Sequence, residues 1–294
     1  MECRERTRRY RTMKPLIATT RRQDSLTLAD PSAQACETAQ DVLLRDPMSL
    51  GPQLRPFFGY YGGKWRDALK NYPPPKYDTI VEPFAGSAGY ALRYADRQII
   101  LCEADPIVAA VWDYLIRVEP EEILAIPDVE PHQSVDDLAI SQEARWLVGF
   151  WLNRGAASPR KSPSRWMRDR IRPGSFWGER VRQTIASQVH AIRHWKVVNA
   201  GYSECGFAGP ATWFVDPPYQ LAGKHYRYGS NGIDYGDLAV WCTTRHGQVI
   251  VCENLGASWL PFREVAQVKT TRGHRRSLEV VWTVENDVGA DPAS

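Results

Sequence analysis

Four consecutive residues, Asp216-Pro217-Pro218-Tyr219, place a carboxylate, two stiff backbone carbonyls and an aromatic ring directly after the apolar run 213–215. Each proline fixes its own φ and lacks an N–H donor, so the segment is held extended and its carbonyls are left to accept hydrogen bonds. Asp216 adds a charged acceptor, and Tyr219 adds a face for stacking. These groups suit the amino group of a flat ring. A simple turn after a strand is the alternative, because Asp and Pro are common in turns.

A second unusual string, Val81–Gly89, also follows an apolar run and precedes a helical pattern. In open α/β sheets, ligands bind beyond the carboxyl ends of the strands, where a glycine-rich turn lets them approach the backbone. The glycine spacing is not the dinucleotide fingerprint G-x-G-x-x-G. Further on, the apolar run 99–102 ends at Glu103-Ala104-Asp105, and an acidic residue there suits ribose hydroxyls. Asp105 before Pro106 is also a typical helix N-cap, and the two roles are compatible.

The chain beyond residue 77 alternates strand and helix patterns, which indicates an α/β protein with a mostly parallel sheet. The predicted strands are 79–81, 98–102, 196–198, 213–215, 248–252 and 278–284. The predicted helices are 88–95, 107–118, 134–152 and 180–195. We expect the last strand to be antiparallel, because no crossover helix precedes it. The apolar stripe of Val181, Ile185, Val189 and Ile192 is expected to face the core.

The order of these motifs resembles that of the Dam-like adenine-specific DNA methyltransferases, which use S-adenosylmethionine. Phe58–Lys64 resembles the N-terminal cofactor motif of that family, and Glu82–Gly89 resembles its glycine-rich motif. Asp105 resembles the ribose ligand, and Asp216–Tyr219 resembles the catalytic motif. The resemblance covers about residues 56–285. One departure is Ala88, which stands where many relatives have a second glycine of the turn.

The resemblance implies a mostly parallel α/β sheet of the class I (Rossmann-like) methyltransferase type, with an inserted basic helical or loop region for target recognition at about 145–195. It implies methyl transfer from S-adenosylmethionine to the exocyclic amino group of adenine after base flipping, with no metal. The implied catalytic residues are Asp216, Pro217, Pro218 and Tyr219. The implied cofactor-binding residues are Tyr60, Gly62, Gly63, Lys64, Glu82, Phe84, Gly86, Asp105 and Asp216.

The sequence leaves alternatives for the roles of Lys64 and Glu82 and for the substrate that is methylated. Lys64 could pair with the methionine carboxylate of the cofactor or only decorate a turn, and Glu82 could bind the methionine ammonium or cap a strand end. An N4-cytosine methyltransferase would use the same crevice but more often carries Ser or Asn at position 216, and a protein-glutamine methyltransferase would carry Asn there. The motifs do not distinguish RNA from DNA. A catalytically silent DNA-binding module is the alternative from another class.

Positive charge is concentrated in one part of the chain, although the formal net charge is only +3. Residues 145–200 contain twelve Lys or Arg but only two acidic residues, whereas residues 119–137 are acidic. Such asymmetry is typical of a surface that contacts nucleic-acid phosphates. The interleaved Trp166, Phe176 and Trp177 could contact bases or turn into the core. The residues expected to contact DNA, which we expect to be double-stranded, are Arg154, Arg160, Lys161, Arg165, Arg168, Arg170 and Arg172.

Composition sets the remaining expectations for this chain of 294 residues, of which 43% are apolar and 24% charged. These values are typical of a globular domain, so we expect a methyltransferase domain at 55–294 after a disordered basic tail at 1–54, and a monomer. Six cysteines without a C-x-x-C pair predict neither a zinc site nor a disulfide framework. Cys102 and Cys252 fall in predicted strands and are expected to be free and buried, which favours a reducing compartment. With no apolar stretch of membrane-spanning length, we expect a cytoplasmic, nucleoid-associated protein of bacterial or phage origin and no membrane contact.

Overall fold

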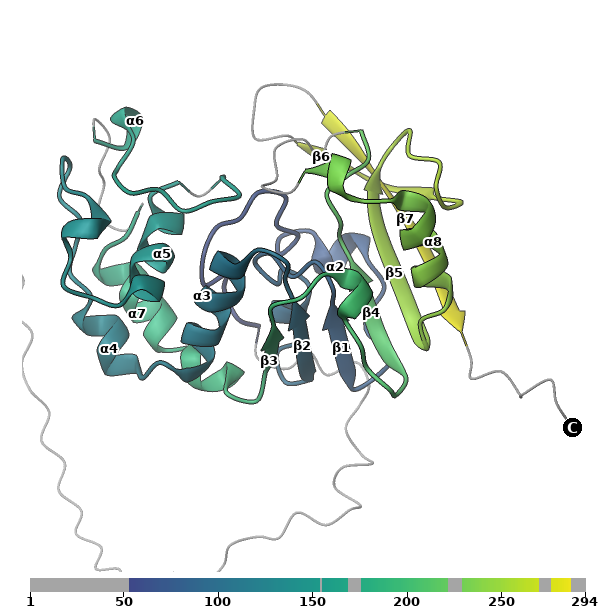
Figure 1. Ribbon diagram of the computed structural model, residues 1–294, viewed down its shortest axis with the longest axis horizontal. Helices are drawn as coiled ribbons and strands as arrows, with labels where there is room; N and C mark the ends of the chain where they lie inside the picture. Colours follow the sequence, from purple (N-terminus) through teal and green to yellow (C-terminus); the bar gives the residue numbers. More distant parts are fainter. Residues whose placement is uncertain (1–52, 154, 169–175, 222–228, 270–275, 287–294) are drawn as a thin grey trace, which may run out of the picture. The chain divides into compact units, whose positions relative to one another are not determined.

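The computed structural model describes residues 53–153, 155–168, 176–221, 229–269 and 276–286, all within one compact unit, Leu50–Ser294. Almost all of the predicted N-terminal tail therefore lies outside the described residues. The described part contains a seven-stranded mixed sheet with the order β3-β2-β1-β4-β5-β7-β6 (Figure 1). The strands are β1 (Thr79–Glu82), β2 (Gln98–Cys102), β3 (Lys196–Val198), β4 (Ala211–Val215), β5 (Gly247–Asn254), β6 (Arg263–Lys269) and β7 (Arg276–Asn286).

The first five strands are parallel, and the sheet turns antiparallel only at its far edge. β1 pairs in parallel with both β2 and β4, β2 pairs with β3, and β4 pairs with β5. β7 is antiparallel to β5, as predicted, and β6 is antiparallel to β7. The chain runs outward from β1 to β2 and β3, then returns to β4 on the other side. This reversal between β1 and β4 is the position at which open α/β sheets form a ligand crevice.

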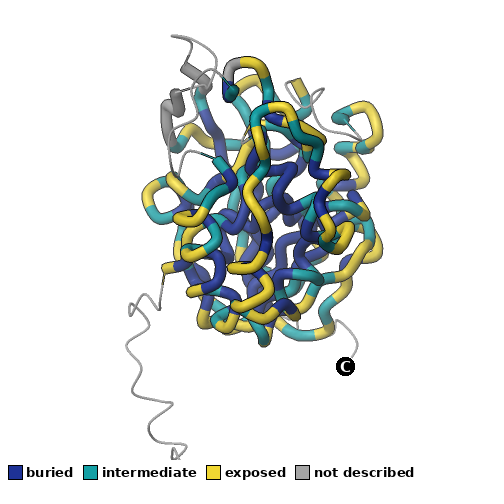
Figure 2. Tube along the Cα trace, turned by 90° about the vertical axis from the view of Figure 1, so that its left-hand side faces the viewer, coloured by how far each residue is buried: buried dark blue, intermediate teal, exposed yellow. Residues whose placement is uncertain are grey.

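Helices and apolar strand residues form a core on each face of the sheet. The helices are α2 (Ala68–Asn71), α3 (Pro106–Arg117), α4 (Pro120–Ala125), α5 (Gln142–Trp151), α6 (Arg165–Arg168), α7 (Glu179–Ala186) and α8 (Tyr235–Thr243). Because strand side chains alternate between faces, Ile80, Phe214 and Ile250 pack in one core with α3, α5 and α7. Val81 and Trp213 pack in the other core with α8. Figure 2 shows these buried segments enclosed by intermediate and exposed ones.

Several predicted elements are confirmed with small changes of length, but the expected helix at 88–95 is wrong. Only a 3-10 turn, η1 (Ala91–Arg93), forms there. Ala88 has φ 50°, in the left-handed region, so a regular helix cannot begin at this residue. The expected helix at 134–152 divides into η2 (Val135–Asp137) and α5, because the Ser141 side chain caps a new helix start.

The predicted helix 180–195 is likewise divided, into α7 and a 3-10 turn, η3 (Val189–Ile192). Its apolar stripe is nonetheless buried in the main core, as expected. Sequence patterns missed α2, α4, β6 and α8. Within the described segments, no helix has the length and apolar character needed to cross a bilayer.

The expectation that Cys102 is a free cysteine is wrong. Cys102, the last residue of β2, forms a disulfide with Cys205, and their Cα atoms lie 6.0 Å apart. The sequence could not reveal this pair, because 103 residues separate the two cysteines and only the folded sheet brings them together. Cys252 is free and buried, as expected, and so is Cys242. The expectation of a reducing compartment depended on free Cys102 and free Cys252, and of these two only Cys252 is free.

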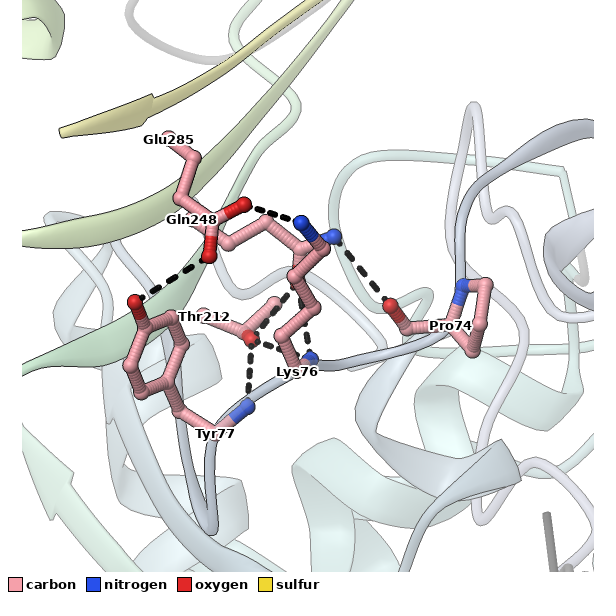
Figure 3. A network of polar contacts seen from close by, with 6 residues as sticks. All are labelled: Pro74, Lys76, Tyr77, Thr212, Gln248 and Glu285. Atoms are coloured by element: carbon pink, nitrogen blue, oxygen red, sulfur yellow. Dashed lines mark hydrogen bonds and ion pairs between the residues drawn. The ribbon is translucent and has the colours of Figure 1, made fainter. Parts of the chain in front are cut away.

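A polar network fixes the loop before β1 to the amino-terminal ends of β4 and β5 (Figure 3). The buried Gln248 at the start of β5 donates to the Pro74 carbonyl at 3.2 Å. Its Oε1 accepts from the Lys76 N–H at 3.0 Å and from the Thr212 hydroxyl at 2.8 Å. The exposed Lys76 side chain adds an ion pair to Glu285 at the end of β7. One amide thus joins the β1 loop to β4 and β5.

We expect Gln248→Ala to lower the free energy of unfolding by about 1–3 kcal/mol, because it removes the hydrogen bonds that this buried amide makes with Pro74, Lys76 and Thr212. Urea denaturation would measure the change. Lys76→Ala is the matched control, because it removes only the exposed ion pair and keeps the Lys76 N–H. Equal free energies of unfolding for the Gln248→Ala variant and the control would show that the hydrogen bonds of Gln248 contribute nothing to stability.

Candidate functional site

The carboxyl ends of β1, β2 and β4 surround a cavity of about 370 Å³ at the point where the strand order reverses. The structure brings all nine predicted cofactor residues to its wall: Tyr60, Gly62, Gly63, Lys64, Glu82, Phe84, Gly86, Asp105 and Asp216. Pro218 also lines it, whereas Pro217 and Tyr219 are not among the lining residues. The position of these residues is thus observed, and their role in binding stays a prediction.

Glycines allow two of the motifs to pack backbone against backbone at this cavity. A Cβ atom at Gly89 would lie 2.7 Å from the Trp65 nitrogen, and one at Gly63 would lie 2.9 Å from the Ser87 hydroxyl. Gly86 has φ 46°, which a side chain rarely tolerates. Ala88 adopts a similar φ of 50°. A glycine at position 88 would therefore fit this turn with less strain.

Glu82 ends β1 as a buried carboxyl group. Its Oε1 accepts a hydrogen bond from the Ala91 N–H at 2.6 Å, so it caps the turn that replaces the expected helix. Burial raises the pKa of Glu82 to about 8, and the hydrogen bond from Ala91 opposes this rise only in part. At neutral pH the free protein therefore holds Glu82 mostly protonated. A cation bound beside Glu82 would favour its ionised form.

Glu103 and Asp105 organise the end of β2. Glu103 accepts from the Gly86 N–H at 2.9 Å through one carboxyl oxygen and from the Asp105 N–H at 2.8 Å through the other. Burial raises the pKa of Glu103 to about 6. Asp105 accepts from the Ile107 N–H at 3.0 Å and caps α3, which confirms the predicted N-cap. Glu103 thereby fixes the glycine-rich turn to the neighbouring strand.

Lys64 is paired with the predicted catalytic carboxylate. Its Nζ lies 2.8 Å from both carboxyl oxygens of Asp216 and 2.9 Å from the Gly62 carbonyl. The Lys64 side chain is only 5% exposed and that of Asp216 is 15% exposed, so Lys64 does not merely decorate a surface turn. Burial raises the pKa of Asp216, while the charge of Lys64 opposes the rise. The same Nζ lies 4.9 Å from the centre of the Tyr219 ring.

An aromatic wall of Phe84, which the sequence predicted, and Tyr202, which it did not, completes the cavity. The rings of Phe84 and Tyr202 stack with their centroids 5.5 Å apart and an interplanar angle of 26°. Because the rings contact each other, they form one continuous wall and leave no space for a third ring between them. Tyr202 begins η4 (Tyr202–Glu204), which the disulfide at Cys205 holds beside β2. The only sequence signal for Tyr202 was its position after a predicted parallel strand.

The described part of the basic region offers fewer available charges than the sequence suggested. Arg160 and Arg165 are exposed, and Lys161 is exposed but pairs with Asp136 at 2.6 Å. Arg168 donates to the Pro163 carbonyl at 3.0 Å. Arg154, Arg170 and Arg172 lie outside the described residues.

Other basic residues in this stretch support the fold itself. Arg145 donates twice to the Leu138 carbonyl, and Arg193 donates to the carbonyls of Ile116 and Val118. Trp177 turns into the core and donates to the Pro127 carbonyl at 3.0 Å, one of the two placements that its sequence allowed. Among the described residues of this stretch, Arg160, Arg165, Arg180 and Lys196 are exposed and form no ion pair.

The described residues contain no group of three or more His, Cys, Asp or Glu side chains arranged to hold a metal ion. In comparisons with known proteins, no family model matches the chain and no curated protein matches it significantly.

The raised pKa of Glu82 predicts how stability changes with pH. Folding favours the protonated carboxyl, so its contribution is fully present below the ordinary Glu pKa and is lost as the pH rises through about 8. Glu82→Gln carries no charge at any pH. Its free energy of unfolding should therefore rise relative to wild type between about pH 5 and 8, by about 1.4 kcal/mol for each pH unit. Urea denaturation across this range would test it, and a difference independent of pH would contradict it. Glu121→Gln, on the surface of α4, is the control.

Proposed function

We propose that this protein is an S-adenosylmethionine-dependent methyltransferase of the class I (Rossmann-like) type that methylates the exocyclic amino group of adenine in double-stranded DNA, as Dam-like enzymes do. One observation carries the proposal. The Asp216 carboxylate, set by β4 and two prolines, lies on a cavity whose other walls are the glycine-rich turn after β1 and the acidic segment after β2. A nucleophile-activating group and a nucleotide-like site thus meet at one strand reversal.

The cavity has the chemistry that this cofactor requires. Asp105 and Glu103 present carboxyl groups to ribose hydroxyls, and the wall of Phe84 and Tyr202 suits a purine ring. Glu82 would face the methionine ammonium, which would favour ionisation of its carboxyl group. Lys64 would face the methionine carboxylate. The bound cofactor would supply an electrophilic methyl group on sulfur, and the chain must orient the nucleophile.

Orientation matters because the lone pair of the adenine amino group is delocalised into the ring. If Asp216 accepts one N–H and the Pro217 carbonyl accepts the other, the nitrogen becomes more tetrahedral and its lone pair points at the methyl group. The Pro218 carbonyl already accepts from the Tyr235 hydroxyl. No donor to the Pro217 carbonyl occurs among the described residues, which supports its assignment to the base. Positioning and fixed hydrogen bonds then account for the rate.

Lys64 stands where the base would enter. Its ammonium contacts Asp216 and the face of Tyr219, the two groups proposed to hold the flipped adenine. In the free enzyme this charge stabilises the ionised form of Asp216 despite its burial. An entering amino group must replace Lys64 at one carboxyl oxygen. After transfer, the nitrogen's excess proton leaves to solvent.

The decisive experiment measures transfer of a labelled methyl group from S-adenosylmethionine to mixed-sequence duplex DNA and maps the modified base. Label at adenine N6 supports the proposal. Label at cytosine N4, label only on RNA, or DNA binding without incorporation would each replace it with the corresponding alternative.

In this assay, we expect Asp216→Ala to abolish methylation while S-adenosylmethionine and DNA still bind, because the acceptor matters most as charge develops on the nitrogen. Tyr219→Ala should lose less activity, since stacking contributes about 1–3 kcal/mol per base. Tyr219→Phe should lose least, because it keeps the aromatic ring that would stack on the base. Asp216→Ala activity within about tenfold of wild type would mean that the tetrapeptide is only a turn.

The proposed DNA surface predicts a change in salt dependence. Each phosphate neutralised by Lys or Arg contributes about −0.9 to the slope of log affinity against log salt. Combined alanine substitution of Arg160, Lys161, Arg165 and Arg168 should flatten this slope without changing cofactor affinity. Substituting the exposed Lys70, which lies outside residues 145–200, is the control for general charge loss. An unchanged slope in the fourfold variant would place the DNA surface elsewhere, with the arginines of residues 4–11 as the next candidates.

A further inference from the structure

The backbone of the predicted catalytic tetrapeptide is held at two points by residues outside the cavity. The Tyr235 hydroxyl, at the start of α8, donates to the Pro218 carbonyl. The Glu253 carboxyl group, near the end of β5, accepts from the Gln220 N–H at 3.0 Å. Because prolines have no N–H, this segment offers few backbone groups by which it can be fixed. The two contacts use groups on either side of Tyr219 and leave the Pro217 carbonyl to the substrate.

Glu253 is fully buried and makes hydrogen bonds through both carboxyl oxygens. Besides Gln220, it accepts from the Asn254 N–H at 2.9 Å and from the Trp259 indole N–H at 3.1 Å. A carboxyl group buried in this way is retained at a cost in solvation, which these three donors offset. The group therefore fixes the loop after β4 to the loop after β5.

Trp259 connects the two contacts. Its N–H donates to Glu253, and its ring packs against Tyr235 with the centroids 5.5 Å apart. Phe262 also contacts the indole, with the ring centroids 5.2 Å apart. One side chain thus supports both the residue that holds the Pro218 carbonyl and the residue that holds the Gln220 N–H.

We propose that Tyr235, Glu253 and Trp259 form a clamp of positioning residues that sets the direction of the Pro217 carbonyl and the Tyr219 ring for methyl transfer. This inference rests on the proposed function. None of the three residues lines the cavity, so the clamp acts through the tetrapeptide and not on the cofactor. A small displacement of reacting groups is enough to slow a reaction by about a hundredfold, which makes backbone position a sensitive variable.

The test compares kcat and the KM for S-adenosylmethionine in Tyr235→Phe, Trp259→Phe and Glu253→Ala. Tyr235→Phe removes only the hydroxyl donor and keeps the ring, whereas Trp259→Phe removes the N–H donor and replaces the indole by a smaller aromatic ring. We expect kcat to fall about tenfold or more, with KM for the cofactor within about twofold of wild type. Glu253→Gln should recover part of the loss of Glu253→Ala, because its amide oxygen can still accept from Gln220 and Trp259.

The matched controls are Tyr114→Phe and Trp177→Phe, which lose a hydrogen bond to Glu122 and to the Pro127 carbonyl far from the site. These controls should keep wild-type kcat. The clamp is overturned if the wild-type protein methylates DNA and the clamp variants have the same kcat. It is also overturned if the controls lose as much kcat as the clamp variants. A wild-type protein that methylates no nucleic acid would instead overturn the proposed function, and the clamp with it.

Discussion

Desolvation of four carboxyl groups governs the edge of the sheet on which the cavity depends. Glu82, Glu103, Asp216 and Glu253 lie at the carboxyl ends of β1, β2, β4 and β5. Each would be costly to bury alone, and each is satisfied by a donor from a different segment: Ala91, Gly86, Lys64 and Gln220 respectively. If one of these loops moved away, a buried carboxyl group would lose its hydrogen-bond donor. The same groups that define the site therefore also hold it in shape.

Local sequence patterns were sufficient for the parallel sheet and for the residues at its carboxyl edge. Apolar runs that end in Val81, Cys102 and Val215 marked the strands correctly, because a buried parallel strand needs an unbroken apolar run. The nine residues expected around a cofactor do line one cavity. For the residues that follow β1, β2 and β4, this proximity could be predicted because the ends of parallel strands meet at one edge. For residues 60–64, which precede β1, it was implied only by the family resemblance.

What the sequence concealed depends on contacts between distant segments. The left-handed conformation of Ala88 replaced a helix by a 3-10 turn, and nothing in the alanine side chain signals it. Tyr202 became a cavity residue only through its stacking with Phe84, 118 positions earlier in the numbering. The ion pair of Lys64 with Asp216 joins residues 152 positions apart. In the basic region, the sequence predicted that arginines would be available to contact phosphates. Arg145 and Arg193 instead donate hydrogen bonds to backbone carbonyls of the fold.

The disulfide also gives the chain a covalent ring. The bond between Cys102 and Cys205 encloses α3 to α7 and β3, so the stretch that carries Arg160 and Arg165 is tethered at both ends by sulfur. Both anchors adjoin cavity residues, Glu103 on one side and Ser203 on the other. Because the ring persists when the chain unfolds, it limits how far the basic stretch can separate from the cavity residues and lowers the entropy of the unfolded chain.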